Sequence, residues 1–149
     1  MPYSAPVADY LFIFNKIVNF KQLTQEDRFF EVSTDLVAAI LEEAGKISTE
    51  VLAPLQRVGD INPAFLENGV VRTPPGFGEA YQSIADNGWI GMAASSEYGG
   101  MGLPQSLMHA VNEMMGGACL SLQLNPVMTQ GQIEALEHHA SEDLKKLYL

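Results

Sequence analysis

Residues 34–55 of this 149-residue chain read TDLVAAILEEAGKISTEVLAPL, and this stretch indicates the fold class. Its apolar residues recur every three or four positions, which is the spacing of one stripe along an α-helix. The stripe consists of Leu36, Ile40, Ala44, Ile47, Val51 and Leu55. We expect Thr34 or Asp35 to be the N-cap. Pro54 lacks a backbone N–H, so it should kink this long helix or end its regular part.

The rest of the chain has helical apolar spacing and no long alternating stretch that would predict a strand. Further helices are expected over residues 6–18, 77–86, 104–117 and 118–139, with partly helical structure around 24–30. Ser141, followed by two acids, is typical of the start of a last helix. Asn68-Gly69 predicts a hairpin-type turn, although the apolar runs beside it are too short for a stable sheet. The sequence therefore predicts an all-α domain.

The charge distribution excludes two classes of partner. Eighteen acidic residues against eight basic ones give a formal net charge of −10, and only Lys145 and Lys146 among the bases are adjacent. Nucleic acid and anionic membranes are poor partners, because binding to them needs clustered Lys and Arg. Charged residues make up only 17% of the chain, below the average of about 25% for soluble domains. Part of the surface is therefore expected to meet another domain or subunit.

The sequence favours a cytoplasmic protein without a membrane span. Its single cysteine, Cys119, cannot form an internal disulfide, which suits a reducing compartment. No basic run precedes an apolar core near the N-terminus, so no signal peptide is expected. Residues 114–133 carry no charge over twenty positions, but Asn125, Pro126 and three glutamines are costly in hydrocarbon. We interpret this stretch as buried protein interior.

The sequence contains no complete catalytic or metal site. His138, His139 and Glu142 are candidate metal ligands, but no further ligand has suitable spacing, and a solvated helix end explains them better. Two glycine-rich segments, 76–78 and 99–102, resemble parts of phosphate-binding loops, and turns with positive φ explain them better. We therefore assign no catalytic residue and no metal ligand.

Several motifs, taken together, resemble the N-terminal domain of acyl-CoA dehydrogenases. They are VLAPL at 51–55, PPGFGEAY at 74–81, NGWIG at 87–91, EYGGMG at 97–102 and SEDLKKLYL at 141–149. The resemblance implies that residues 34–149 are this helical bundle-like domain. Residues 1–33 resemble an extension found in a subset of the family that includes methylthiopropionyl-CoA dehydrogenases. Ser95 and Ser96 stand where relatives usually have Pro-Glu, a departure at positions that carry no catalytic group.

The resemblance implies a flavoenzyme that desaturates an acyl-CoA thioester between Cα and Cβ. In this family a carboxylate removes the α-proton, the β-hydride passes to FAD, and the electrons leave through an electron-transferring flavoprotein. The flavin-contacting motif lies in a β-barrel domain, and the catalytic glutamate and most oligomer contacts lie in a C-terminal helical domain. Neither domain is present in residues 1–149. We therefore expect this fragment to be inactive alone and the complete enzyme to be a homo-oligomer.

The resemblance also implies one substrate-binding surface. By alignment with the segment before the last helix, Leu124, Val127, Met128 and Gly131 should form one wall of the acyl pocket. An uncharged run suits such a wall, and Gly131 would let a thioester-linked chain approach the backbone. Ordinary helix packing is an equal alternative for each of these residues taken singly.

Two other functions fit the same residues. One is a freestanding helical interaction module derived from this domain, which would expose the apolar wall to a partner helix. The other is a small-molecule carrier whose helices enclose a fatty tail. The chain stops within the amphipathic pattern of residues 144–149 without a C-terminal cap, from which we expect a longer protein. A reading frame that continues into a flavin domain favours the enzyme, and a stop codon after Leu149 favours the module.

Overall fold

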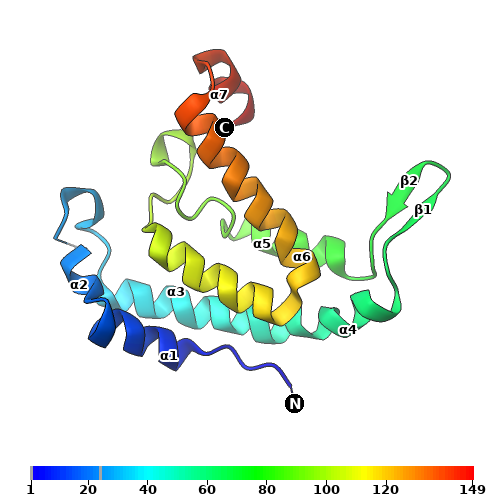
Figure 1. The fold of residues 1–149 in the computed structure, drawn as a ribbon, viewed down its shortest axis with the longest axis horizontal. Helices are drawn as coiled ribbons and strands as arrows, with labels where there is room; N and C mark the ends of the chain where they lie inside the picture. Colours follow the sequence, from blue (N-terminus) through cyan, green and yellow to red (C-terminus); the bar gives the residue numbers. More distant parts are fainter. Residues whose placement is uncertain (1, 24) are drawn as a thin grey trace.

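Two long helical segments packed against each other form the centre of the computed structural model, which describes residues 2–23 and 25–149 (Figure 1). The first segment comprises α3 (Thr34–Lys46), the π-helical turn η3 (Ile47–Leu52) and α4 (Ala53–Ile61), and the second is α6 (Gln105–His139). The remaining elements are α1 (Val7–Phe12), η1 (Ile13–Ile17), α2 (Phe20–Leu23), η2 (Asp27–Phe29), β1 (Phe65–Glu67), β2 (Val70–Arg72), α5 (Phe77–Asp86), η4 (Ser96–Tyr98) and α7 (Glu142–Tyr148). The regular secondary structure of the described residues is helical apart from one two-stranded hairpin, which confirms the predicted fold class.

The first segment begins and bends at residues whose chemistry explains both features. Ser33 is the N-cap, because its Oγ accepts a hydrogen bond from the Leu36 N–H at 3.1 Å. The prediction of Thr34 or Asp35 was therefore wrong by one or two positions, since serine caps a helix as well as either of them. The prediction for Pro54 is confirmed. The helix widens into η3 immediately before the proline, and regular helix resumes in α4.

The buried stripe of this segment is displaced from the predicted one. Ala44 and Ile47 are buried as predicted, but Leu36 is 40% exposed. Several side chains that enter the core lie one position further along: Val37, Leu41, Ser48 and Leu52. Ser48 is fully buried in the middle of this second stripe. Because serine is polar, it interrupts the apolar pattern, and a search for regularly spaced apolar residues does not find this stripe.

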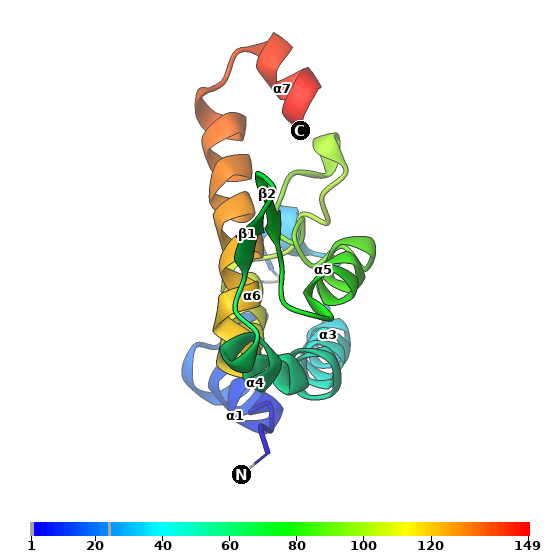
Figure 2. The ribbon, with the colours of Figure 1, turned by 90° about the vertical axis from the view of Figure 1, so that its right-hand side faces the viewer.

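Helix α6 bends sharply at Cys119, where the backbone angles (φ −153°, ψ 86°) are not helical. The bend divides α6 into a first arm, residues 105–118, and a second arm, residues 120–139 (Figures 1 and 2). The first arm carries most of the buried side chains of α6. The second arm rises beyond the core and leads to α7 (Figure 2). The predicted helix boundary near residues 117 and 118 is confirmed to within two positions.

The uncharged stretch 114–133 crosses this bend, and its interpretation as protein interior was wrong for one side of the second arm, although Leu122, Gln123 and Pro126 of that arm are buried. Met114, in the first arm, is 1% exposed, whereas Leu124, Val127 and Met128 are 53%, 42% and 65% exposed. The side of the second arm that carries these three residues therefore faces solvent. No helix in the described ranges is long and apolar enough to cross a membrane.

The residues before α3 pack onto the core rather than extend away from it. The Tyr3 hydroxyl donates a hydrogen bond to the Met114 carbonyl at 2.7 Å. The Phe14 and Phe20 rings stack with their centroids 4.8 Å apart, and both are buried. The N-terminal segment is therefore part of the same hydrophobic core as α6.

Shorter predicted elements agree with the structure to different degrees. Helix α5 covers the predicted range 77–86, and α7 follows Ser141, whose Oγ accepts a hydrogen bond from the Leu144 N–H at 3.4 Å. The helical structure expected around 24–30 is only partly found. It consists of the 3-10 turn η2, preceded by α2 outside the expected range, while Thr24 lies outside the described residues.

Strands β1 and β2 form a hairpin that projects from the body of the domain (Figure 1). They pair antiparallel, with Leu66 opposite Val71. Asn68 and Gly69 have positive φ angles of 51° and 78°, which confirms the predicted turn. All six strand residues are exposed, so the hairpin adds no buried core to the domain.

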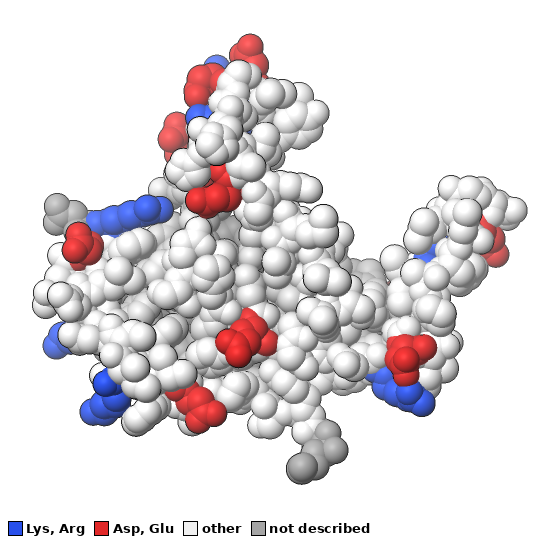
Figure 3. Space-filling model, viewed as in Figure 1, with Lys and Arg blue, Asp and Glu red and all other residues white. Residues whose placement is uncertain are grey.

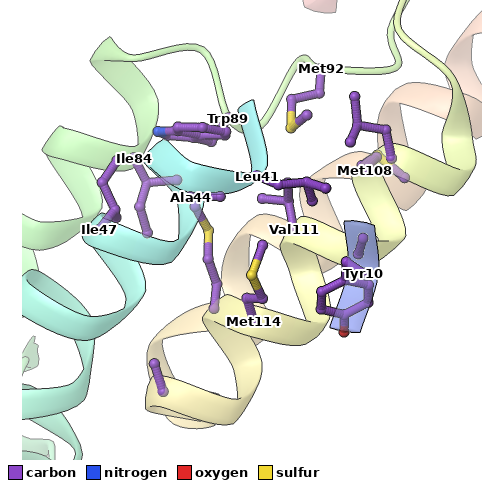
Figure 4. Packing of buried hydrophobic residues seen from close by; sticks show 14 of the residues in the cluster. Tyr10, Leu41, Ala44, Ile47, Ile84, Trp89, Met92, Met108, Val111 and Met114 are labelled. Atoms are coloured by element: carbon purple, nitrogen blue, oxygen red, sulfur yellow. The ribbon is translucent and has the colours of Figure 1, made fainter. Parts of the chain in front are cut away.

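Replacement of Trp89 tests how the core is closed beneath the loop that follows α5. Trp89 is 8% exposed and belongs to the core cluster with Ile84 and Leu41 (Figure 4). Trp89→Ala should lower the free energy of unfolding by about 3–5 kcal/mol, because it leaves a large cavity. Urea unfolding followed by far-UV circular dichroism measures this loss, since the variant retains no tryptophan fluorescence.

Phe30→Ala is the matched control for this prediction. Phe30 is 72% exposed, so its truncation should cost less than about 1 kcal/mol. A loss for Trp89→Ala as small as that of the control would show that the tryptophan does not support the core.

Candidate functional site

A cavity of about 480 Å³ lies between the two arms of α6 and the loop that follows α5. Its lining is mostly apolar and includes Ile90, Ala93, Met108, Val127 and Ile133. Polar side chains enter it from both arms, among them Asn112 and Gln130. A concave, mainly apolar surface with a few placed polar groups is typical of sites that bind small molecules.

Backbone hydrogen bonds within the loop between α5 and α6 hold this side of the cavity in place. The Met101 N–H donates to the Gly91 carbonyl at 3.0 Å, and the Gly102 N–H donates to the Ala94 carbonyl at 2.9 Å. Gly100 passes so close to Ala94 that a Cβ at residue 100 would overlap the Ala94 carbonyl. The loop is therefore a fixed wall whose N–H groups are largely used internally.

The glycine-rich segments turn as the sequence predicts. Gly76, Gly99 and Gly102 have positive φ angles of 82°, 86° and 63°. Only glycine adopts these conformations without a steric cost. Chain reversal, rather than phosphate binding, therefore accounts for glycine at these three positions.

Three amide side chains join the arms of α6 beside the cavity. Asn112 Nδ2 donates to Gln130 Oε1 at 2.7 Å, and Gln123 Nε2 donates to Asn112 Oδ1 at 3.0 Å. Gln130 Nε2 also donates to the Trp89 carbonyl at 3.4 Å, which connects the second arm to the loop. Sequence reasoning missed this cluster. Asn112 and Gln130 are 18 positions apart, and no short motif joins them.

The four residues predicted to form a pocket wall lie along one side of the second arm, at helical spacings of three and four. Val127 and Gly131 line the cavity. Leu124 borders a separate hollow against α4, and Met128 is mostly exposed to solvent. The structure thus brings two of the four residues to the cavity and leaves the other two on the adjoining surface.

The residues interpreted as a solvated helix end make exposed surface contacts. His138 Nε2 lies 3.2 Å from Glu134 Oε1, and both side chains are more than half exposed. Glu142 Oε1 accepts a hydrogen bond from Lys145 Nζ at 3.1 Å. Within residues 2–23 and 25–149, no three His, Cys, Asp or Glu side chains are grouped as they would be around a metal ion.

Tyr10 and Cys119, two other titratable groups near the first arm, belong to the core, whereas His109 of the first arm and Glu134 of the second arm line the cavity. Burial, and then the nearby Glu113 carboxylate, raises the pKa of the Tyr10 phenol. Cys119 is fully buried at the bend, with its Sγ 3.7 Å from Ser121 Oγ. Cys119 therefore packs as a small core residue, in agreement with its apolar surroundings in the sequence.

The fold and the cavity define an all-α domain that presents an apolar helix side next to a ligand-sized hollow. Residues 38–149 match the family described as "Acyl-CoA dehydrogenase, N-terminal domain", so the chain belongs to this family. It is also 38% identical over 149 residues to the 3-methylmercaptopropionyl-CoA dehydrogenase of Ruegeria pomeroyi. That match covers 100% of this chain and 25% of the relative, so the chain spans about a quarter of the relative's length.

Gly100→Ala tests the rigid loop that borders the cavity. The added Cβ would overlap the Ala94 carbonyl, so the loop must shift, and the free energy of unfolding should fall by about 1–3 kcal/mol. Urea unfolding measured by circular dichroism gives the loss. Gly78→Ala is the control, because a Cβ there meets no heavy atom within 4 Å and should leave stability unchanged or slightly raised. Equal stability of the two variants would contradict the close approach.

Proposed function

We propose that residues 1–149 form the N-terminal part of a flavin-dependent acyl-CoA dehydrogenase that converts an acyl-CoA thioester to its α,β-unsaturated form. Family membership supports this class of enzyme, and the relative's name gives a sulfur-containing acyl-CoA as the substrate of that relative. The chain would contribute one wall of the acyl pocket and contacts between domains, and would be inactive alone. The observation that carries the proposal is the apolar stripe at the cavity and beside it, which consists of Leu124, Val127, Met128 and Gly131.

The stripe suits contact with an acyl chain for two physical reasons. Val127 and Met128 present aliphatic and thioether atoms, which bind an alkyl chain by removing apolar surface from water. At Gly131 an added Cβ would have no heavy atom within 4 Å. A ligand chain can therefore approach the backbone of the second arm more closely at Gly131 than at its larger neighbours.

The described residues do not form a site that fits FAD. A flavin nucleotide needs free backbone N–H groups or basic side chains for its pyrophosphate. The loop beside the cavity already uses the N–H groups of Met101, Gly102 and Leu103 in bonds to its own carbonyls. No Lys or Arg of the described chain lines the cavity. We therefore place the flavin and the catalytic base in other parts of the enzyme and derive no chemical step from these residues.

The proposed enzyme is a homo-oligomer in the cytoplasm that passes electrons to an electron-transferring flavoprotein. The low charge density supports contact with further protein surface. On the face in Figure 3, charged side chains are few and lie mostly near the margins. The single buried Cys119 suits a reducing compartment. The assignment of an electron-transferring flavoprotein as the electron acceptor rests on the family resemblance.

We place the boundary between the N-terminal extension and the family domain after residue 33. Ser33 caps α3, so a new helix begins there, and the family match begins at residue 38. The extension packs closely on the domain. A Cβ added at Gly45 in α3 would lie 2.7 Å from Val7 Cγ2, so the glycine makes room for α1. The extension would therefore support α3 and the core from outside.

Expression of the natural gene that encodes these residues, next to residues 1–149 alone, tests the proposal. The complete gene product should be yellow and should reduce an electron-accepting dye when an acyl-CoA is added, while residues 1–149 should do neither. A folded gene product that binds no flavin and oxidises no acyl-CoA would contradict the proposal. It would favour the interaction module, whose exposed apolar wall at Leu124 and Met128 would contact a partner helix.

Gly131→Leu in the active enzyme tests the pocket wall. The new side chain should shorten the space for the acyl chain, so kcat/KM should fall about tenfold or more for long acyl chains and little for short ones. Steady-state kinetics over a series of chain lengths measures this difference.

Gly78→Leu is the control for the wall variant, because residue 78 is exposed on α5 and the space around a Cβ there is also open. Thermal unfolding of both variants should stay close to that of the wild type. A loss of kcat/KM that is equal for all chain lengths would show that Gly131 does not form part of the pocket wall.

A further inference from the structure

Residues 3–7 lie against both central helical segments, and we call them the N-terminal strap. Tyr3, Ala5 and Val7 are partly buried and pack on the core, whereas Ser4 and Pro6 between them are exposed. The strap therefore has an inner side of three side chains and an outer side that faces solvent. It leads into α1, which contacts α3 (Figure 1).

Two glycines inside helices leave room for the inner side of the strap. A Cβ added at Gly117, in the first arm of α6, would lie 3.3 Å from Cε2 of the Tyr3 ring. A Cβ added at Gly45, in α3, would lie 2.7 Å from Val7 Cγ2 and 3.4 Å from Ala5 Cβ. Glycine within a helix lowers its stability relative to alanine, so glycine at both positions needs a reason. The strap supplies this reason, because a larger residue at either position would press against it.

Two tyrosine hydroxyls attach the N-terminal residues to consecutive positions of the first arm. The Tyr3 hydroxyl donates to the Met114 carbonyl at 2.7 Å, and the Tyr10 hydroxyl forms a hydrogen bond with the Glu113 side chain. The Tyr10 ring is also buried beside the first arm (Figure 4). Residues 113–117 of the first arm are therefore held by side chains that come from outside α6.

The held residues lie between the cavity and the bend of α6. Asn112, which lines the cavity and bonds Gln130 of the second arm, immediately precedes them. Cys119, where the regular helix is interrupted, follows two positions after Gly117. Such an interruption leaves the direction of the second arm to the contacts around it rather than to the helix itself. A shift of residues 113–117 would therefore move the two arms relative to each other and change the width of the cavity.

We propose that the N-terminal strap fixes the bend of α6 and thereby the width of the cavity that receives the acyl chain. This inference rests on the proposed function. Tyr3 is a positioning residue, because it does not line the cavity and acts through Met114 and Gly117. A cavity of fixed width discriminates between narrow and branched acyl chains, whereas a cavity whose arms can separate discriminates less.

Tyr3→Ala in the complete enzyme tests the strap with two isomeric substrates. Hexanoyl-CoA and 4-methylpentanoyl-CoA have the same composition but differ in the width of the acyl chain. The wild-type enzyme should favour the narrower hexanoyl chain in kcat/KM, and Tyr3→Ala should lower this preference about threefold or more. Tyr3→Phe, which keeps the ring and loses only the hydroxyl, should lower it less. Steady-state kinetics well below the unfolding temperature of each variant measures the preference.

Hydrogen exchange followed by mass spectrometry gives a second measurement, which does not depend on activity. Backbone amides of residues 119–123, at and directly after the bend, should exchange faster in full-length Tyr3→Ala than in the wild type. The reason is that a bend without its strap opens more often and exposes these amides to water. The increase should be concentrated at these residues rather than spread over the chain.

Gly117→Ala and Gly116→Ala form a matched pair, because the two glycines are neighbours in the same helix. A Cβ at Gly116 meets other side chains only at 3.9 Å, whereas a Cβ at Gly117 meets the Tyr3 ring. Gly117→Ala should therefore lower the preference for the hexanoyl chain, and Gly116→Ala should leave it unchanged. In the Tyr3→Ala background, Gly117→Ala should have no further effect on the preference, because the ring that it displaces is absent.

Three outcomes would overturn the inference. The first is a wild-type enzyme that oxidises both isomers with equal kcat/KM. The second is a set of folded strap variants that keep the wild-type preference and exchange faster evenly along the chain, which would make the strap an ordinary part of the core. The third is that the effects of Tyr3→Ala and Gly117→Ala add. Failure of the proposed function is distinguishable, because neither isomer would then be oxidised, while exchange at residues 119–123 would still respond to Tyr3→Ala.

Discussion

The bend of α6 at Cys119 is the constraint on which the rest of the structure depends. A straight helix of 35 residues would extend about 50 Å. Its first half could then lie in the core, but its second half could not face the first. The non-helical backbone at Cys119 lets the first arm bury Val111 and Met114 in the core (Figure 4). The second arm is then free to form a cavity with the first. One continuous segment therefore supplies both the centre of the fold and the side of the candidate site.

Most of the helices, and some of their ends, could be predicted because they depend mainly on local chemistry. Repeated apolar spacing, Asn68-Gly69 and the cap at Ser141 act over a few residues, and the structure confirms them. Burial depends instead on which neighbours approach. Ser48 lies deep in the core although it is polar, while Leu36 is substantially exposed although it is apolar. The predicted stripe was displaced for this reason.

The sequence could identify the second arm as apolar but not as exposed. An apolar side chain indicates that contact with water is costly, and it does not show what covers it. Residues 114–133 are uncharged on both sides of the bend, so their sequence does not distinguish the buried arm from the exposed one. Family resemblance was needed to propose Val127 and Gly131 as part of a pocket wall. The amide cluster was beyond sequence reasoning, because Asn112 and Gln130 meet only after the bend has folded the arms together.

The cavity thus combines two kinds of contact that have different physical consequences. Apolar burial is non-directional, so the apolar lining can hold a ligand without fixing its position along the cavity. Hydrogen bonds are directional, and the amides beside the wall are already oriented by the protein. Gln130 is bonded to the carbonyl of Trp89, whose ring lies in the core. The packing that stabilises the fold therefore also fixes the orientation of the polar groups of the cavity before any ligand enters.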